Sequence, residues 1–425
     1  MLPLHVTSET APLRQVLVHT PGDEMGLVSP EAFDRLLFDD ILFADEAREE
    51  HEVMKRLFRR VVGEDDAVLE LGALVRETFR APEARAHYVE ELIELLPERN
   101  YEAYESELKG LDADALHRFA FTGQAPFPVS AHPLPNLLFT RDLAAVVGGH
   151  VVLSTAARAA RRPESALIRA VFRFHPRFAG AEDRLIELPE SVSFEGGDLL
   201  VASEKVVLIG QSERTSLGGA VQAARALLAR TPVEHVLVVN LPKQRSCMHL
   251  DTVFTFADAS TCVVFPPIIE GYTDNVYELS RADVAPGEDA PEASGAAGSG
   301  DPRAFGMRVH SGLHAALETR LGREVTFIPC GTDPISQRRE QWTDGANLFA
   351  LRPGLVVGYT RNRETYARMR EHGFHVVGAE DFLQFYGEGE LPPDGKIAVR
   401  LEGNELSRGR GGPRCMTMPL VRDAE

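Results

Sequence analysis

The chain has 425 residues, of which 44% are hydrophobic and 26% are charged, and its formal net charge is −19. This length and composition are sufficient for a sizeable core and predict two or three domains, or one large domain with an insert. The acidic balance argues against a nucleic-acid-binding protein and against a polybasic membrane anchor, because both need a basic surface to meet phosphate groups.

Neither a targeting signal nor a membrane span is expected. The first residues lack a basic region followed by a continuous apolar one, and no apolar run approaches the roughly 18 residues of a membrane helix. The cysteines form no CxxC pair, which argues against a disulfide framework and a zinc site. We therefore expect a cytoplasmic protein with reduced thiols.

Residues 64–125 differ from the rest of the chain. Apolar side chains recur there at helical spacing among acidic ones, and Pro82 and Pro97 interrupt the pattern. This pattern predicts three or more amphipathic helices. We interpret the stretch as an all-helical insert in a larger domain that comprises residues 1–63 and 126–425.

The larger domain contains a repeat. Each copy opens with a polar cluster that holds Asp or Asn, followed by an apolar strand, a tight turn, a second strand rich in Val and the start of a helix. The four copies are 139–158, 194–215, 249–267 and 344–365. The segments 13–22 and 397–420 are candidates for a shared or fifth unit. A repeat of about 50 residues predicts a propeller-like α/β array in which the polar clusters converge on the axis.

The stretch 284–303 has low complexity, since 14 of its 20 residues are Ala, Pro, Gly or Ser. Such a composition buries too little apolar surface to offset the entropy of ordering. We expect a flexible surface loop within the propeller, without a role in chemistry.

Functional groups recur at the matching positions of the repeat. Taken one by one, an Asp before a strand is commonly a turn residue, a His is commonly a packed residue, and a Cys is commonly a small core residue. Their recurrence favours one shared site. The residues are Asp142, Glu195 with Asp198, His249 with Asp251, and Cys415.

Cys415 has a distinctive sequence context. It follows the Gly-rich stretch 408–414, whose three arginines suggest a setting that favours a thiolate. Cys247 is the rival, because strand alternation would place it on one face with His249 and Asp251. A metal site is not expected, since no second His or Asp cluster accompanies these residues.

Several long motifs, in order over essentially the whole chain, resemble the arginine deiminase family of guanidino-group-modifying enzymes. The motifs are SETAPLRQVLVHTPG at 8–22, LLFDD at 36–40, LPNLLFTRD at 134–142, FEGGD at 194–198, GQSERTS at 210–216, MHLDTVFT at 248–255, CGTDPISQRREQWTDGANLFAL at 330–351 and GRGGPRCMTMPL at 409–420. The resemblance implies a five-fold pseudo-symmetric α/β propeller with a helical insert.

The resemblance also implies a function and a site. L-arginine would be hydrolysed to L-citrulline and ammonia through a covalent S-alkylthiouronium on Cys415, with His249 as general acid and base. Glu195 would lie beside His249, and Asp142 and Asp251 would hold the guanidinium nitrogens. The implied substrate-binding residues are Asn136, Phe139, Arg161, Arg214, Gly409 and Arg410. No metal or cofactor is implied, nor any nucleic acid or membrane partner; a homo-oligomer is compatible.

The chemistry of the substrate agrees with these residues. A guanidinium stays protonated and is costly to bury unless carboxylates pair with it. Acids around an empty site would raise the pKa of Cys415, and the arriving cation would lower it. We therefore expect that substrate binding assists formation of the thiolate.

Three alternatives stay open at this point. Another guanidino-group hydrolase or an amidinotransferase would share the fold, although Arg214 and Arg410 favour free arginine, whose carboxylate pairs well with arginines. A Cys/His peptide hydrolase would not need two aspartates in its site. A catalytically silent arginine-binding protein would not need Cys415 and His249.

Overall fold

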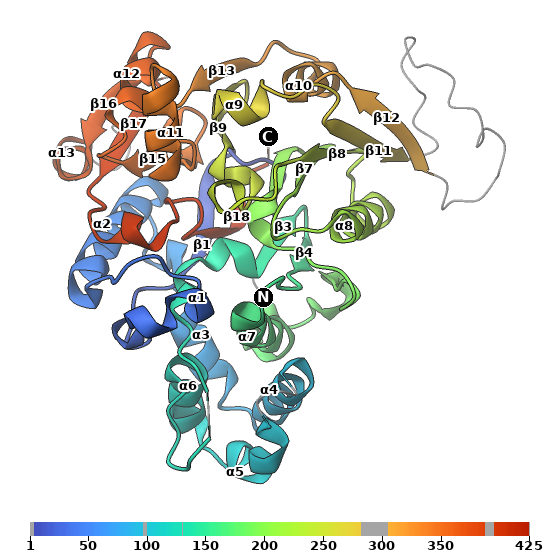
Figure 1. The fold of residues 1–425 in the computed structure, drawn as a ribbon, viewed down its shortest axis with the longest axis vertical. Helices are drawn as coiled ribbons and strands as arrows, with labels where there is room; N and C mark the ends of the chain where they lie inside the picture. The colour runs from blue at the N-terminus through green and yellow to red at the C-terminus, as the bar shows by residue number, and fades with distance from the viewer. Residues whose placement is uncertain (1–3, 97–99, 130, 282–304, 387–394, 425) are drawn as a thin grey trace.

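A computed structural model describes residues 4–96, 100–129, 131–281, 305–386 and 395–424. Within these ranges the strands form five sheets, with helices outside them (Figure 1). In order of strand pairing, the sheets are β18 (Met418–Arg422), β1 (Leu13–Val18) and β2 (Val68–Glu70); β3 (Ala144–Val147), β4 (His150–Leu153) and β5 (Leu185–Ile186); β12 (Phe305–His310), β11 (Val276–Arg281), β8 (His235–Asn240), β7 (Val206–Gln211) and β6 (Leu199–Ser203); β13 (Thr326–Pro329), β10 (Thr261–Val264) and β9 (Phe254–Asp258); and β14 (Phe349–Arg352), β15 (Leu355–Tyr359), β17 (Ile397–Leu401) and β16 (His375–Gly378).

Helices connect the strands and cover the sheets (Figure 1). They are α1 (Phe33–Leu36), α2 (Ala44–Val62), α3 (Leu71–Thr78), α4 (Pro82–Leu95), α5 (Glu105–Lys109), α6 (Ala113–Thr122), α7 (Arg162–Phe174), α8 (Leu217–Arg230), α9 (Pro266–Ile269), α10 (Leu313–Leu321), α11 (Pro334–Trp342), α12 (Arg363–Glu371) and α13 (Ala379–Phe385). Within the described ranges, none of them combines the length and the apolar character that a membrane span requires.

The four repeats predicted from the sequence each form an antiparallel hairpin. The hairpins are β3–β4, β6–β7, β9–β10 and β14–β15. The second strand of each hairpin then pairs in parallel with a later strand of its own sheet, for which the chain needs a crossover connection. The predicted unit of hairpin plus helix is therefore confirmed in all four places.

The two ends of the chain complete one sheet. β1 pairs antiparallel with β18 and parallel with β2. The prediction that 397–420 belongs as a whole to a unit shared with the N-terminal strand was wrong for its first part. β17 lies between β15 and β16 in a different sheet, because Ile397–Leu401 is an almost fully buried run suited to a central parallel strand.

The stretch read as helical contains α3, α4, α5 and α6 (Figure 1). Before these helices it contains a 3-10 turn and the strand β2. Val68–Glu70 pair with β1, so pairing with the sheet overrides the helical pattern there. The helices share one hydrophobic cluster with α7 and with β3 and β4, through residues such as Leu74, Val89, Leu167 and Val151. The division at 64 and 125 stays a prediction.

One sheet carries an extra hairpin. β11 pairs with β8 and β12 pairs with β11, both antiparallel, so this sheet has five strands. The connection between β11 and β12 includes the low-complexity segment 284–303, which lies outside the described residues.

Candidate active site

Short 3-10 turns carry the predicted catalytic residues to equivalent places in different sheets. Asp142 lies in the turn Thr140–Leu143, directly before β3. Glu195 immediately precedes the turn before β6, and His249 immediately precedes the turn before β9. Cys415 lies three residues before β18. Each side chain thus stands at the entrance to the first strand of its unit, and the five-sheet arrangement brings these entrances together.

One pocket gathers most of the predicted site. Its lining includes every residue predicted to bind substrate, together with Asp142, His249 and Cys415. Glu195 and Asp251 stand behind the lining, in contact with His249 and with the thiol. The pocket also has lining residues that the sequence analysis did not identify: Leu37, Arg245, Met248 and Thr252.

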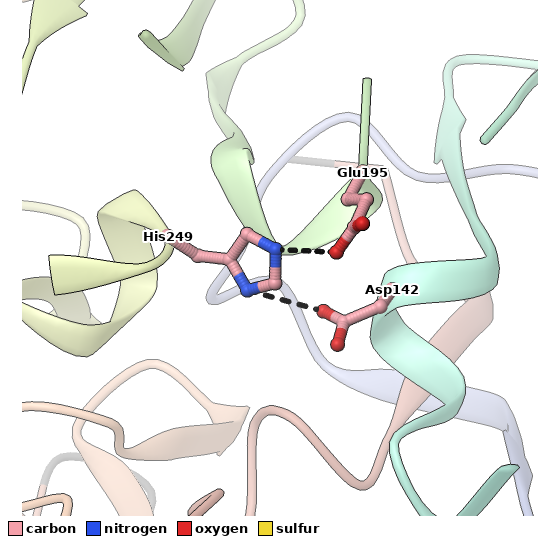
Figure 2. Close-up of side chains that lie close together, drawn as sticks. All are labelled: Asp142, Glu195 and His249. Atoms are coloured by element: carbon pink, nitrogen blue, oxygen red, sulfur yellow. Dashed lines mark hydrogen bonds and ion pairs between the residues drawn. The ribbon is translucent and has the colours of Figure 1, made fainter. Parts of the chain in front are cut away.

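His249 lies between two carboxylates from different sheets (Figure 2). Its Nε2 is 2.9 Å from Glu195 Oε2, and its Nδ1 is 3.5 Å from Asp142 Oδ1. Burial alone would lower the pKa of His249, but Asp142, Glu195 and Asp198 outweigh it and raise the pKa to about 10. Burial opposes ionisation of Glu195 as well, yet His249, Arg214 and Arg161 lower its pKa to about 2. The pair is therefore an imidazolium and a carboxylate at neutral pH.

Gly197 makes this close approach possible. A Cβ at this position would lie 2.6 Å from Asp142 Oδ1 and 2.7 Å from His249 Nδ1, both well inside van der Waals contact. Every other residue would push the carboxylate and the imidazole apart. This explains why a glycine follows two residues after Glu195 in the FEGGD motif.

The same cluster has the ligand types for a metal ion. One ligand atom each from Asp142, Glu195 and His249 lies within 4.8 Å of the others. A bound ion would have to displace the proton of His249. It would also compete with Arg161, whose Nη1 bonds to Asp142 Oδ2 and lies 3.8 Å from Glu195 Oε2.

Cys415 is almost fully buried beside Asn347 and Asp251. Asn347 Nδ2 lies 3.2 Å from Sγ, and Sγ lies 3.7 Å from Asp251 Oδ2. The Asn347 Oδ1 accepts hydrogen bonds from the backbone N–H groups of Arg414 and Cys415. Asn347 thus contacts both the sulfur and the backbone of the nucleophile loop.

Burial and the surrounding acids keep the thiol of Cys415 protonated in the free protein. Burial raises the pKa of the thiol, and Asp251, Asp142 and Asp344 raise it further. The expectation that the arginines before Cys415 favour a thiolate was wrong for the free protein. Those at 408 and 414 are paired elsewhere, the first with Asp40 and Glu405 and the second with Glu9 and Asp251.

The two site aspartates share one feature. Arg161 bonds to Oδ2 of Asp142, and Arg414 Nη1 donates to Oδ2 of Asp251 at 2.8 Å. The other oxygen of each carboxylate, Oδ1, is buried and has no hydrogen-bond partner within the described residues. Each aspartate is thus held by a protein cation through its Oδ2. Oδ1 of Asp142 faces His249 Nδ1 at 3.5 Å, beyond hydrogen-bond distance, and Oδ1 of Asp251 stays without a hydrogen-bond partner in the described ranges. In this arrangement Arg161, predicted to bind substrate, binds Asp142 and Glu164.

Two further arginines line the pocket with N–H groups that have no acceptor. Arg214 is almost fully buried, and its Nε lacks a hydrogen-bond partner in the part of the chain that the structure describes. The same holds for Nε and Nη1 of Arg410. The guanidinium carbon of Arg410 lies 3.2 Å from the ring centre of Trp342.

Cys247 lies apart from this arrangement. The residues around it form two 3-10 turns, Arg245–Cys247 and Leu250–Thr252, so the strand alternation assumed for 247, 249 and 251 was wrong. Cys247 is buried in a hydrophobic cluster and does not line the pocket. The four cysteines are all free thiols.

Sequence reasoning missed Asn347, Arg414 and Glu9. Asn347 stands at the matching position of the fourth repeat, but an amide by itself gives no catalytic signal. Arg414 is the neighbour of Cys415. Glu9 accepts from Arg414 Nε at 3.0 Å across 405 residues of sequence, and no local pattern could have indicated that pair.

Comparisons with known proteins agree on one family. The family model described as "Arginine deiminase" matches residues 103–422. The arginine deiminase of Listeria monocytogenes serotype 4b (strain CLIP80459) is 34% identical over 99% of this chain and 98% of its own. That of Limosilactobacillus fermentum is 30% identical over 99% of each chain.

The fold also has a solved counterpart. The structure of SxtG, an amidinotransferase from Microseira wollei, superposes with a TM-score of 0.54 at 11% identity. The alignment covers 100% of this chain and 98% of that one. At this identity the similarity concerns the mixed α/β fold alone.

Proposed function

The chain belongs to the arginine deiminase family, and on this premise we propose that it hydrolyses L-arginine to L-citrulline and ammonia in arginine catabolism. Cys415 is the nucleophile of this proposal, and His249 is its general acid and base. No metal or cofactor takes part in the proposed steps.

One observation carries the proposal. At the thiol end of the pocket, two buried carboxylate oxygens, Asp142 Oδ1 and Asp251 Oδ1, lack hydrogen-bond partners among the described residues. On the same pocket, Arg214 and Arg410 have buried N–H atoms without acceptors. Unpaired buried polar groups are costly, so a ligand that satisfies all of them binds favourably. L-arginine has a cation for the aspartates and a carboxylate for the arginines.

The first half of the reaction forms a covalent adduct. The guanidinium enters beside Asp142 and Asp251, and its positive charge lowers the pKa of Cys415, whose proton leaves to solvent. The thiolate sulfur attacks the guanidinium carbon. As the tetrahedral adduct collapses, the C–N bond to one terminal nitrogen breaks and His249 gives its proton to the departing ammonia. Cys415 then carries an S-alkylthiouronium.

The second half releases the product. His249, now neutral, takes a proton from a water molecule that attacks the same carbon. The carbon–sulfur bond then breaks, the proton of the new hydroxyl group passes to the sulfur to restore the thiol of Cys415, and L-citrulline leaves. Glu195 holds the imidazole through its Nε2 in both protonation states, and the contact of Asn347 Nδ2 with Sγ orients the sulfur.

For the architecture, we propose a five-fold pseudo-symmetric propeller with a helical insert between its first and second units. Five sheets, four of them built on matching hairpins, support this view. A boundary after β2 suits the insert better than one at residue 64, because β2 pairs with β1.

Incubation of the purified protein with L-arginine tests the function. Citrulline and ammonia are expected in equal amounts, and rapid quenching should trap an adduct on Cys415 with the mass of arginine less ammonia. An adduct on Cys247 would contradict the mechanism. Absence of citrulline, or cleavage of peptides instead, would overturn the function.

A further inference from the structure

Arg410 is held differently from the other arginines around the site. Arg161 and Arg414 give their N–H groups to carboxylates of the protein. Arg410 makes no ion pair within 4 Å among the described residues, and its guanidinium lies against the ring of Trp342. Its backbone has a left-handed φ of 66°.

A contact with an aromatic face has a specific consequence. The ring stabilises the cation through its quadrupole and supplies no hydrogen-bond acceptor. A carboxylate at the same place would fix the guanidinium equally well but would occupy its N–H donors. The ring of Trp342 therefore fixes Arg410 while its Nε and Nη1 stay available to a ligand in the pocket.

Trp342 is itself tied to the catalytic residues through its neighbours in sequence. It is the last residue of α11, and Gln341 donates from Nε2 to the backbone carbonyls of Ser246 and Thr252, on either side of His249. Asn347, five residues after Trp342, contacts the sulfur of Cys415. The segment 341–347 thus connects the histidine turn, the nucleophile and Arg410.

The carboxylate of Asp344 is a competing partner for Arg410 if the ring of Trp342 is absent. It is buried, exerts an attractive field on Arg410, and has one oxygen, Oδ2, without a hydrogen-bond partner in the described ranges. Burial raises the pKa of Asp344 to about 7, so a cation drawn toward it would be stabilised by the carboxylate. Loss of the ring would leave this field acting on Arg410 unopposed, at the expense of the N–H donors that the pocket needs.

We propose that Trp342 is a positioning residue that determines specificity: it holds Arg410 over the pocket with free N–H donors, and so selects substrates that carry an α-carboxylate. This inference rests on the proposed function, in which Arg410 receives that carboxylate. The side chain of Trp342 is 47% exposed, so its replacement removes little core packing.

Steady-state kinetics with L-arginine and with agmatine, which lacks the carboxylate, test the proposal. W342L should raise the KM for L-arginine about tenfold with a smaller change in kcat, as expected for loss of a partly buried cation–π contact. W342F, which keeps an aromatic face, should stay within about threefold of the wild type. Neither variant should change kcat/KM for agmatine. Tyr272→Leu is the matched control, since Tyr272 is 50% exposed and does not line the pocket.

The outcomes separate the two hypotheses. If W342L and W342F lose kcat/KM for L-arginine equally, or if kcat/KM for agmatine falls by the same factor, the role of Trp342 is merely structural and the inference is overturned. The inference would also be overturned if the wild type turns over L-arginine and W342L has the same KM and kcat. A wild-type protein that makes no citrulline overturns the proposed function and, with it, the role of Trp342.

A second readout needs no turnover. Trp342 is the single tryptophan of the chain, so tryptophan fluorescence reports the surroundings of this residue alone. Arg410→Ala should shift or brighten the emission, and L-arginine added to the Cys415→Ala variant should change it as well. Emission unaffected by either would overturn the inference.

Discussion

The two ends of the pocket differ in how far their charged side chains are already paired within the protein. At the thiol end, the protein's own cations already neutralise half of each carboxylate: Arg161 holds Asp142, and Arg414 holds Asp251. At the other end, Arg214 and Arg410 keep N–H groups without acceptors. The difference shows that the acidic end is prepared to accept one further cation. At the arginine end, Arg214 has only longer contacts with Glu213 and Glu195, at 3.7 and 4.0 Å, so its Nε and the N–H groups of Arg410 depend on the ligand for a hydrogen-bond acceptor.

The largest expected effect is at the thiol end. Cys415→Ala should lower turnover of L-arginine by about 10⁴-fold or more, because no other nucleophile faces the guanidinium carbon. Binding of L-arginine should persist, since both aspartates and both arginines remain. Citrulline assays and titration calorimetry measure the two quantities. Substantial citrulline formation by this variant would contradict the proposed nucleophile.

The buried pair behind Asp251 should matter chiefly for stability. Glu9 accepts from Arg414 Nε and Nη2 at 3.0 and 2.9 Å, and the arginine raises the charged fraction of Glu9 by lowering its pKa to about 2 against the opposing effect of burial. Glu9→Gln keeps the shape but removes the charge, so the free energy of unfolding should fall by about 3 kcal/mol.

An exposed pair supplies the control for this prediction. Asp423 bonds to Arg14 at the surface, and Asp423→Asn should cost less than about 1 kcal/mol because water screens the pair. Urea unfolding measures both variants. Equal costs would mean that the pair of Glu9 and Arg414 holds the acidic end no more firmly than a surface contact does.

Agmatine tests the arginine end. It presents the same guanidinium to the aspartates but leaves Arg214 and Arg410 without an anion. Hydrogen bonds to charged groups contribute about 1.5–3 kcal/mol each, so kcat/KM for agmatine should be at least tenfold lower than for L-arginine. Equal values would show that the two arginines do not receive a carboxylate.

The smallest expected effect is a pH dependence of the unfolding free energy that arises from His249. The fold raises the pKa of His249 from 6.5 to about 10, so the folded state binds this proton more tightly than the unfolded chain. The stabilisation is complete below pH about 6.5 and is lost as the pH rises toward about 10. The difference in unfolding free energy between wild type and His249→Gln should shrink over that window, as urea titrations at several pH values would show. A constant difference would contradict the imidazolium–carboxylate pair.

Much of the site was predictable from the sequence because alignment of the repeats identifies equivalent positions before their first strands. The positions of Asp142, Glu195 and His249 before the first strands of their units follow from matching segments, and the three hairpins agree with that alignment. The role of Cys415 came from the resemblance to the family. The protonation of Cys415 was less predictable. A sequence shows three arginines before the thiol but not the acids that two of them bind elsewhere.

Periodicity and turn residues act over a few positions, and they were enough to predict the hairpins, the helices α3 to α6 and the polar residues that precede the strands. Three features could be seen only in the folded chain: which oxygen of each aspartate is occupied, which arginines keep free N–H groups, and the contact of Trp342 with Arg410. Those features depend on groups far apart in the chain, and the energy of a buried charge is set by whichever partners the fold brings within a few ångströms.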